Sequence, residues 1–155
     1  MAIAKFYLGD PRAPKPNRPA RLGVNILVQQ GGRLLMEYRQ DCDFWSLIGG
    51  GVHGAEPEAG AAVRELREET GIQIRRQQLV RLRAFQEPDR ISAYRNGEVR
   101  RMVCILYRLE LEKEPVLRIS RESRKLEFFT PEQLRRIPIA PTHLPMVELF
   151  CGAEG

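Results

Sequence analysis

The sequence predicts an α+β or α/β fold in which one mixed β-sheet is covered by helices. Segments with the alternating pattern of strands occur before and after an amphipathic helix, and shorter helical segments follow them. The size supports this interpretation, because 155 residues of which 43% are hydrophobic can bury a core without disulfides. The chain shows neither an internal repeat nor a domain boundary. Residues 1–155 are therefore expected to form a single domain.

The N-terminal part should begin with an arm and continue into a β-hairpin. Residues 1–20 are the expected arm, because residues 10–19 hold four prolines and should be extended without ladder hydrogen bonds. Alternating valine and isoleucine predict a strand over residues 22–29. The glycine-containing segment 30–33 predicts a tight turn, and residues 34–39 predict the returning strand.

A helix is predicted over residues 57–70, after a loop over residues 40–51. Pro57 suits the first helical position, and Gly71 suits the cap after the last one. Small and aliphatic residues fall on one stripe that should pack against the sheet. These residues are Ala59, Ala62, Val63 and Leu66.

The remainder of the chain should supply three strands and two helices. The predicted strands cover residues 79–86, 101–111 and 126–130. The predicted helices cover residues 131–136 and 144–150. The resulting order of strands, helix, strands and helices is typical of one mixed sheet with helical layers.

Arginine dominates the positive charge of the chain. The net charge is +5, and 21 of the 25 lysines and arginines are arginine. A planar guanidinium binds phosphate oxygens in pairs, so this composition suits a phosphorylated substrate. The arginines are scattered, whereas a nucleic-acid-binding domain more often shows a basic stripe. Nucleic acid is therefore not an expected partner, and a nucleic-acid-binding domain is the least favoured function.

The composition also bears on location and assembly. No apolar run approaches the roughly 18 residues that a membrane-spanning helix needs, so no membrane contact is expected. Cys42, Cys104 and Cys151 are odd in number and widely spaced, which fits a reducing cytoplasm better than a disulfide framework. The proline-rich arm is compatible with an exchange contact in a homodimer, and equally with a loose tail.

Three glutamates of the predicted helix carry the strongest functional signal. Glu65, Glu68 and Glu69 are spaced i, i+3 and i+4, so they share a helix face, where like charges repel. The helix dipole adds to this cost in the last turn. A bound divalent cation would offset it, and ligands that are all oxygen indicate Mg²⁺, with Mn²⁺ as a substitute. The competing interpretation is a solvated acidic face buffered by Arg64 and Arg67.

The residues around these glutamates follow a longer pattern. Gly50 is followed after five residues by Glu56, and seven residues later by the segment Arg64 to Ile72. This stretch, Gly50 to Ile72, resembles the Nudix box of the Nudix hydrolase family at every fixed position. The wider resemblance covers about residues 20 to 145. It implies a Nudix-type α/β/α sandwich with a catalytic loop–helix–loop and an enzyme that hydrolyses phosphorus anhydride bonds.

The resemblance assigns roles to the box residues one by one. It implies that Glu68 and Glu69 bind the catalytic metal, and that Glu65 joins the metal cluster or helps to activate water. Gly49 and Gly50 match the loop whose backbone carbonyl commonly adds a ligand. A metal ion there would neutralise the phosphates and make a water more acidic.

Three further residues receive roles from the same resemblance. Arg64 matches the arginine that steadies the glutamates, and Glu56 is its expected partner. Glu122 lies before a late strand, where family members often supply a fourth acid, and is expected to be a metal ligand or general base. The alternative for Glu122 is an ordinary exposed glutamate.

The identity of the substrate is less strongly indicated. Arg39, Trp45, Phe85 and Tyr94 are expected to bind it, since aromatic side chains can stack on a base; such aromatic residues are also common in cores. The expected substrate is a nucleoside diphosphate linked to another group. ADP-ribose or a related nucleotide sugar ranks first, because Pro88 resembles a proline of ADP-ribose-cleaving members. Nucleoside triphosphate pyrophosphohydrolysis and a non-catalytic nucleotide-binding module are the alternatives.

Overall fold

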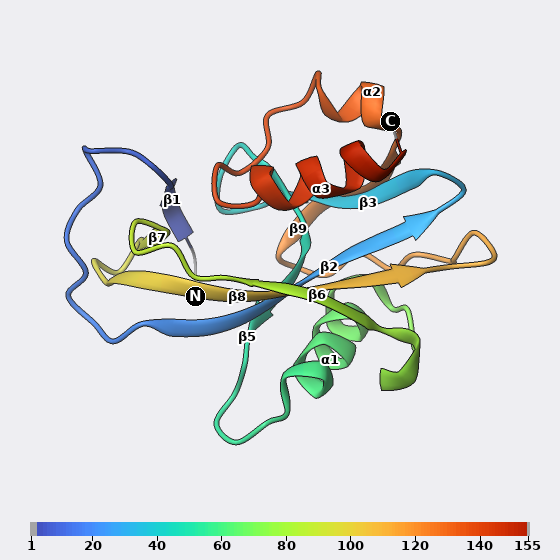
Figure 1. Cartoon of the computed structure of the whole chain (residues 1–155), viewed down its shortest axis with the longest axis horizontal. Coiled ribbons are helices and arrows are strands. Elements are labelled where there is room, and N and C mark those ends of the chain that lie inside the picture. Colours follow the sequence, from blue (N-terminus) through green and yellow to red (C-terminus); the bar gives the residue numbers. More distant parts are fainter. Residues whose placement is uncertain (1–2, 155) are drawn as a thin grey trace.

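The computed structural model describes residues 3–154, and the strands in this range form one sheet (Figure 1). The strands are β1 (Ile3–Tyr7), β2 (Arg21–Gln30), β3 (Arg33–Arg39), β4 (Trp45–Ser46), β5 (Ile48–Gly51), β6 (Val80–Phe85), β7 (Ile91–Tyr94), β8 (Val99–Glu110) and β9 (Ser123–Phe129). The helices are α1 (Glu58–Thr70), the 3₁₀ turn η1 (Arg76–Gln78), α2 (Pro131–Leu134) and α3 (Leu144–Glu154).

The centre of the sheet is the long parallel pair of β2 and β8. The pairing runs from Arg21 opposite Met102 to Gln29 opposite Glu110. On its other edge β2 has two antiparallel partners in succession, β5 beside its first half and β3 at the hairpin end. Parallel and antiparallel pairs therefore coexist, which confirms the predicted mixed sheet. This topology places β5, and the start of the segment that leads to α1, in the middle of the sheet.

Helices cover both faces of the sheet, as Figure 1 shows with α1 on one side and α2 and α3 on the other. The α1 side holds a buried cluster that includes Val24, Ile26, Ile48, Ala62 and Leu66. The opposite side holds a second cluster that includes Leu27, Met36, Met146, Val147 and Phe150. Each such buried aliphatic or aromatic side chain contributes about 1.5–3 kcal/mol through removal from water. The predicted sandwich of two helical layers around a sheet is confirmed.

Four strands were not expected from the sequence. β4 and β5 lie within the predicted loop 40–51, and β7 lies in the predicted connection between two strands. β1 lies within the expected arm 1–20 and pairs with β7. All four have five residues or fewer, and β5 consists mainly of glycine, so none shows the long alternating pattern that reveals a strand.

The proline-rich segment has no helix or strand, as expected, but it is attached to the sheet. The backbone N–H of Asn17 donates to the carbonyl of Val99 at 2.9 Å. The side-chain oxygen of Asn17 accepts the N–H of Val99 at 2.8 Å, and its amide donates to the carbonyl of Gly97. Residues 10–19 thus return along the β7–β8 turn to the start of β2.

The predicted helices are confirmed with small changes at their ends. Helix α1 begins at Glu58, one residue later than expected, with Pro57 as its N-cap. Gly71 closes it in the left-handed conformation, with φ at 80°, and donates its N–H to the carbonyl of Arg67 at 2.9 Å. Helix α3 extends four residues past the predicted end at Phe150.

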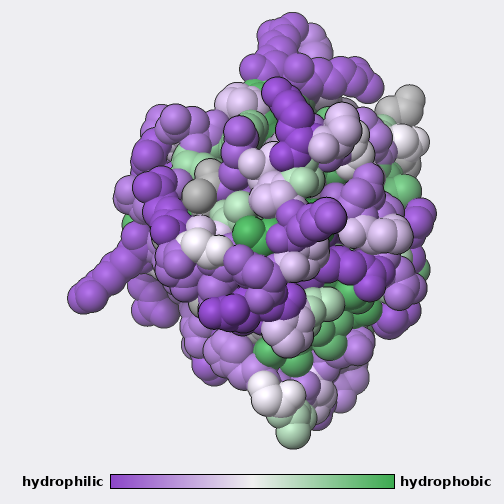
Figure 2. Space-filling model, turned by 90° about the vertical axis from the view of Figure 1, so that its left-hand side faces the viewer, coloured by the Kyte–Doolittle hydropathy of each residue, from purple (hydrophilic) through white to green (hydrophobic). Residues whose placement is uncertain are grey.

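Hydrophilic residues cover most of the face drawn in Figure 2, and its apolar surface is confined to patches between them. Among residues 3–154, no helix is both long and apolar enough to cross a membrane.

Candidate active site

Helix α1 turns two of its glutamates toward the sheet. The buried residues of this helix are Ala61, Ala62, Glu65, Leu66, Glu69 and Thr70. The packing stripe is therefore rotated relative to the predicted one, since Ala59 and Val63 are only half-buried. Glu65 and Glu69 are 9% and 4% exposed, whereas the Glu68 side chain is 52% exposed. The face of α1 that carries these glutamates is therefore partly buried. This burial argues against the alternative of a solvated acidic face.

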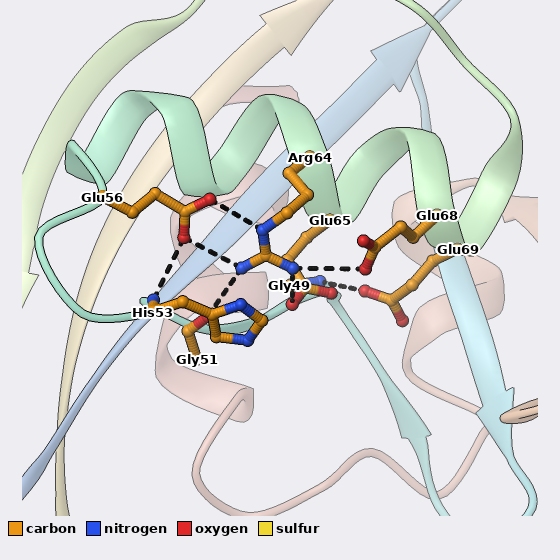
Figure 3. A network of polar contacts seen from close by, with 8 residues as sticks. All are labelled: Gly49, Gly51, His53, Glu56, Arg64, Glu65, Glu68 and Glu69. Carbon is orange, nitrogen blue, oxygen red and sulfur yellow. Dashed lines mark hydrogen bonds and ion pairs between the residues drawn. The ribbon is translucent and has the colours of Figure 1, made fainter.

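Arg64 lies at the centre of a polar network beside these glutamates (Figure 3). Its Nε and Nη2 donate to the two carboxylate oxygens of Glu56 at 2.7 and 3.0 Å. Its Nη1 donates to Glu65 at 3.0 Å and to Glu68 at 3.2 Å. The hydrogen bond from Arg64, followed by that from the His53 backbone N–H, lowers the pKa of Glu56 to about 2. Glu56 therefore stays ionised and holds Arg64 in place.

The glycines before the helix allow the backbone of β5 to approach the glutamates closely. The N–H of Gly49 donates to Glu69 Oε1 at 2.9 Å. A Cβ on Gly50 would lie 2.4 Å from Glu65 Oε1, so the Glu65 carboxylate would have to move away. A Cβ on Gly49 would lie 2.0 Å from the carbonyl oxygen of Val24. The expected metal contact of the Gly49 or Gly50 carbonyl stays a prediction.

The two buried glutamates carry an electrostatic cost. Burial raises the pKa of Glu65 above its ordinary value, despite the contact with Arg64. Burial raises the pKa of Glu69 further, and the neighbouring Glu37 adds to the rise. A carboxylate removed from water and placed near other carboxylates favours its neutral form. A divalent cation at this position would favour the charged form instead.

The oxygen ligands available in the cleft are of the type that binds a hard cation. Their side chains, however, do not converge on one position. Among residues 3–154, no three His, Cys, Asp or Glu side chains form a group positioned to hold a metal ion. Arg64 accounts for part of this, because it draws the carboxylates of Glu65 and Glu68 to its own guanidinium. The available donors are carboxylate and backbone oxygens, which are the ligands that Mg²⁺ and Mn²⁺ prefer.

The glutamates line a cleft of about 570 Å³. One part of its wall is polar and comprises Arg21, Gly49, Gly50, Gly51, Arg64, Glu65, Glu68, Glu69, Arg121 and Glu122. Another part is largely apolar and includes Ile3, Phe6, Leu47, Tyr94 and Met102. The volume and mixed lining match those of small-molecule sites.

The family model of the NUDIX domain matches residues 16–150 of this chain. The chain belongs to the Nudix family. All box residues predicted to act in catalysis are present and lie together in the cleft, and pyrophosphohydrolases occur among the relatives. The protein is therefore a Nudix hydrolase that acts on phosphorus anhydride bonds.

Individual relatives support the assignment over most of the chain. A MutT-like protein of Streptomyces ambofaciens is 30% identical over 131 residues, which cover 83% of this chain and 76% of that protein. The CTP pyrophosphohydrolase of Escherichia coli is 26% identical over 131 residues, covering 82% of this chain and 88% of that protein.

Solved structures with the same fold include a domain bound to ADP ribose and an ADP ribose pyrophosphatase. The NUDIX domain of Shewanella oneidensis NrtR, complexed with ADP ribose, has a TM-score of 0.67 and 19% identity, covering 90% of this chain and 89% of that one. A bifunctional NMN adenylyltransferase/ADP ribose pyrophosphatase of Francisella tularensis, complexed with AMP and a Mn ion, has a TM-score of 0.69 and 21% identity. The structural match covers 91% of this Nudix chain but only 44% of that longer protein.

Glu122, expected as a fourth acid outside the Nudix box, lines the cleft. It is exposed and directly precedes β9. Glu122 also adds to the raised pKa of Glu65, behind burial and the charge of Glu68. The structure thus brings Glu122 close to the box glutamates, and its role as ligand or base stays a prediction.

The expected substrate-binding residues divide into two groups. Arg39 and Tyr94 line the cleft. Arg39 is held by Asp41, to which its Nε donates at 2.6 Å. Trp45 and Phe85 are not in the cleft wall but in the core, so their predicted role in substrate binding is wrong. Trp45 packs edge-on against the Phe129 ring, with centroids 4.9 Å apart.

Sequence reasoning missed an acidic residue that lies beside Glu69. Glu37 lies on β3, is 2% exposed and acts on the pKa of Glu69. It lies thirteen positions before Gly50, outside the box pattern. A charged residue inside an otherwise apolar strand was the only sequence signal that could have revealed it.

Proposed function

We propose that this Nudix hydrolase cleaves the diphosphate linkage of a nucleoside diphosphate joined to another group. ADP-ribose or a related nucleotide sugar is the preferred substrate, and Mg²⁺ is the proposed cofactor, with Mn²⁺ as a substitute. The observation that supports this proposal is that one cleft is lined both by the box glutamates and by a largely apolar wall. Such a cleft suits a ligand with a charged centre and a flatter, less polar end.

Two arginines are available to bind phosphate oxygens. Arg21 and Arg121 line the cleft, and within the described part of the chain neither guanidinium forms a hydrogen bond or an ion pair. Arg21 lies across Gly51, where a Cβ would come within 2.6 Å of its guanidinium. Guanidinium groups bind phosphate oxygens through paired N–H donors. We assign Arg21 and Arg121 to the diphosphate of the substrate.

The remaining steps follow from the residues around the cleft. Glu65, Glu68 and Glu69 would hold the cation, which would supply charge neutralisation at the diphosphate and a more acidic attacking water. Arg64 keeps Glu65 and Glu68 aligned through its own anchor on Glu56. The exposed carboxylate of Glu122 accepts the proton of the attacking water.

Glu122→Gln is expected to lower kcat by about 10²-fold, which is the scale of lost general-base catalysis. The change keeps the shape of the side chain and removes its ability to accept a proton. Steady-state kinetics with the preferred substrate measure it. Glu127→Gln is the matched control, because Glu127 is exposed on β9 and outside the cleft. A decrease below threefold at Glu122 would show that the box glutamates act without it.

A nucleoside triphosphate is the second candidate substrate. The CTP pyrophosphohydrolase of E. coli resembles this chain over 82% of its length, which favours this alternative. Pro88, which supported ADP-ribose in the sequence, is exposed and outside the cleft wall. The preference for ADP-ribose now depends on the NrtR domain, which adopts the same fold and binds ADP ribose.

A panel of nucleotides assayed with Mg²⁺ and with product identification tests the proposal. ADP-ribose should yield AMP and ribose 5-phosphate, whereas a triphosphate would yield a nucleoside monophosphate and pyrophosphate. Activity should disappear when a chelator is in excess and return with added Mg²⁺ or Mn²⁺. Substantial turnover in excess chelator would contradict the metal-dependent mechanism. Binding without turnover of any nucleotide would indicate a non-catalytic module.

A further inference from the structure

Glu37 is a buried carboxylate with an unused oxygen. It lies on β3 and is 2% exposed. Its Oε1 accepts a hydrogen bond from the Ser123 hydroxyl at 2.5 Å. Its Oε2 is buried and accepts no hydrogen bond from any N–H or hydroxyl donor of residues 3–154. A buried carboxylate oxygen without a partner is costly, so it requires an explanation.

A second buried carboxylate lies next to it. Glu69 is 4% exposed, and its carboxylate lies within hydrogen-bond contact of the Glu37 side chain. The Glu69 carboxylate also accepts the Gly49 N–H at its Oε1. Arg39 is the charged group nearest to Glu37 along β3, but its guanidinium is engaged by Asp41. The protein thus holds two adjacent carboxylates without a cationic side chain between them.

A second buried oxygen, on the adjacent strand β4, also lacks a hydrogen-bond partner among the described residues. Ser46 on β4 is directly opposite Glu37 in the antiparallel register, so the two side chains lie on the same face of the sheet. The Ser46 hydroxyl is fully buried and, among the residues described, forms no hydrogen bond. Two unpartnered buried oxygens on neighbouring strands therefore lie on the side of the sheet where Glu69 approaches.

We propose that Glu37 is a further carboxylate ligand of the divalent cation bound by Glu65 and Glu69. The metal site then extends inward from the Nudix box to β3, and Glu37 Oε2 gains the partner that it lacks. Oxygen donors with this charge suit Mg²⁺ or Mn²⁺. The inference rests on the proposed metal dependence, and it adds a ligand that lies outside the box.

Direct metal binding, independent of catalysis, tests the inference. Mn²⁺ is titrated into the metal-free protein, free Mn²⁺ is followed by electron paramagnetic resonance, and water bound to the protein-held ion is followed by proton relaxation. The set comprises the native protein, Glu37→Gln, Glu69→Gln and the control Glu127→Gln. Glu37→Met serves if Glu37→Gln does not fold, because it has similar length and buries no polar group.

Glu37→Gln should raise the dissociation constant for Mn²⁺ by about tenfold or more, on the scale of changes at metal-site partners. Relaxation should show an additional water on the bound ion, because water replaces the lost carboxylate oxygen. The metal-free variant should melt at a higher temperature, since the new amide can donate to Glu69. Glu127→Gln should change none of these quantities.

The remaining outcomes separate the inference from the proposed function. If Glu69→Gln weakens binding and Glu37→Gln does not, Glu37 is not a ligand and the box metal site stands. If neither weakens it, the proposed metal site and the inference both fall. Weaker binding with an unchanged number of bound waters would overturn the ligand role and leave Glu37 as a residue that only positions Glu69.

Discussion

Glu69→Gln is expected to lower kcat by about 10³-fold while leaving the fold intact. The loss follows because a metal ligand disappears, and metal ions supply several kcal/mol of transition-state stabilisation at about 1.4 kcal/mol per tenfold in rate. Glutamine keeps the oxygen that accepts the Gly49 N–H. Glu58→Gln, on the first turn of the same helix, is the control and should retain activity.

The stability of the Glu69→Gln variant should move in the opposite direction. The substitution removes a buried charge from beside Glu37 and Glu65, and from the end of a helix whose dipole disfavours anions. The metal-free variant should therefore be as stable as the native protein or more stable by up to about 1 kcal/mol. The stabilisation that Mg²⁺ adds should shrink, because it depends on the binding constant.

Thermal melts of both proteins with and without Mg²⁺ measure these changes together. A clear loss of stability in the metal-free variant, with undiminished stabilisation by Mg²⁺, would mean that Glu69 is a structural residue. For the proposed mechanism to hold, Glu69→Gln must lower both kcat and the stabilisation that Mg²⁺ adds.

Gly49→Ala is expected to destabilise the protein by about 3 kcal/mol or more, at the upper end of overpacking effects. The added Cβ would lie 2.0 Å from the Val24 carbonyl oxygen and 2.9 Å from Asn25 Cα, both backbone atoms of the central strand β2. These atoms cannot move aside as a flexible side chain can. β5 must instead separate from β2, which also removes the Gly49 N–H from Glu69.

Chemical denaturation of Gly49→Ala measures this loss, and Gly60→Ala is its control. Gly60 lies in α1, and a Cβ there would meet only Pro57 at 3.7 Å, which is an ordinary contact. Alanine should stabilise that position by up to about 1 kcal/mol, because glycine is a poor helix former. An equal, small effect at both glycines would show that β5 does not pack against β2 as described.

Much of the catalytic centre was readable from local spacing. The residues from Gly50 to Ile72 are close in sequence, so helix geometry alone brings Glu65 and Glu69 onto one side of a helix. The end of that helix was also predictable from a neighbouring residue, because Gly71 caps it. Glu122 was predicted from its place in a wider resemblance, and the structure brings it to the same cleft.

Other features depend on contacts between distant segments. β5 is a strand because β2 supplies its hydrogen bonds, and its glycines show no strand pattern of their own. Trp45 and Phe85 looked suited to stack on a base, but they fill the core beneath α3, since burying a large aromatic surface is strongly favourable.

The sequence by itself determined the family, the diphosphate-cleaving chemistry, the mixed sheet and the helix that carries the glutamates, because these depend on periodicity and on residues near one another. Only the tertiary structure decided which side of α1 is buried, which residues line the cleft, and that Glu37 lies beside Glu69. Glu37 and Glu69 are brought together by the packing of a helix against a sheet. Such a contact has no fixed spacing along the chain, so no local pattern could reveal it.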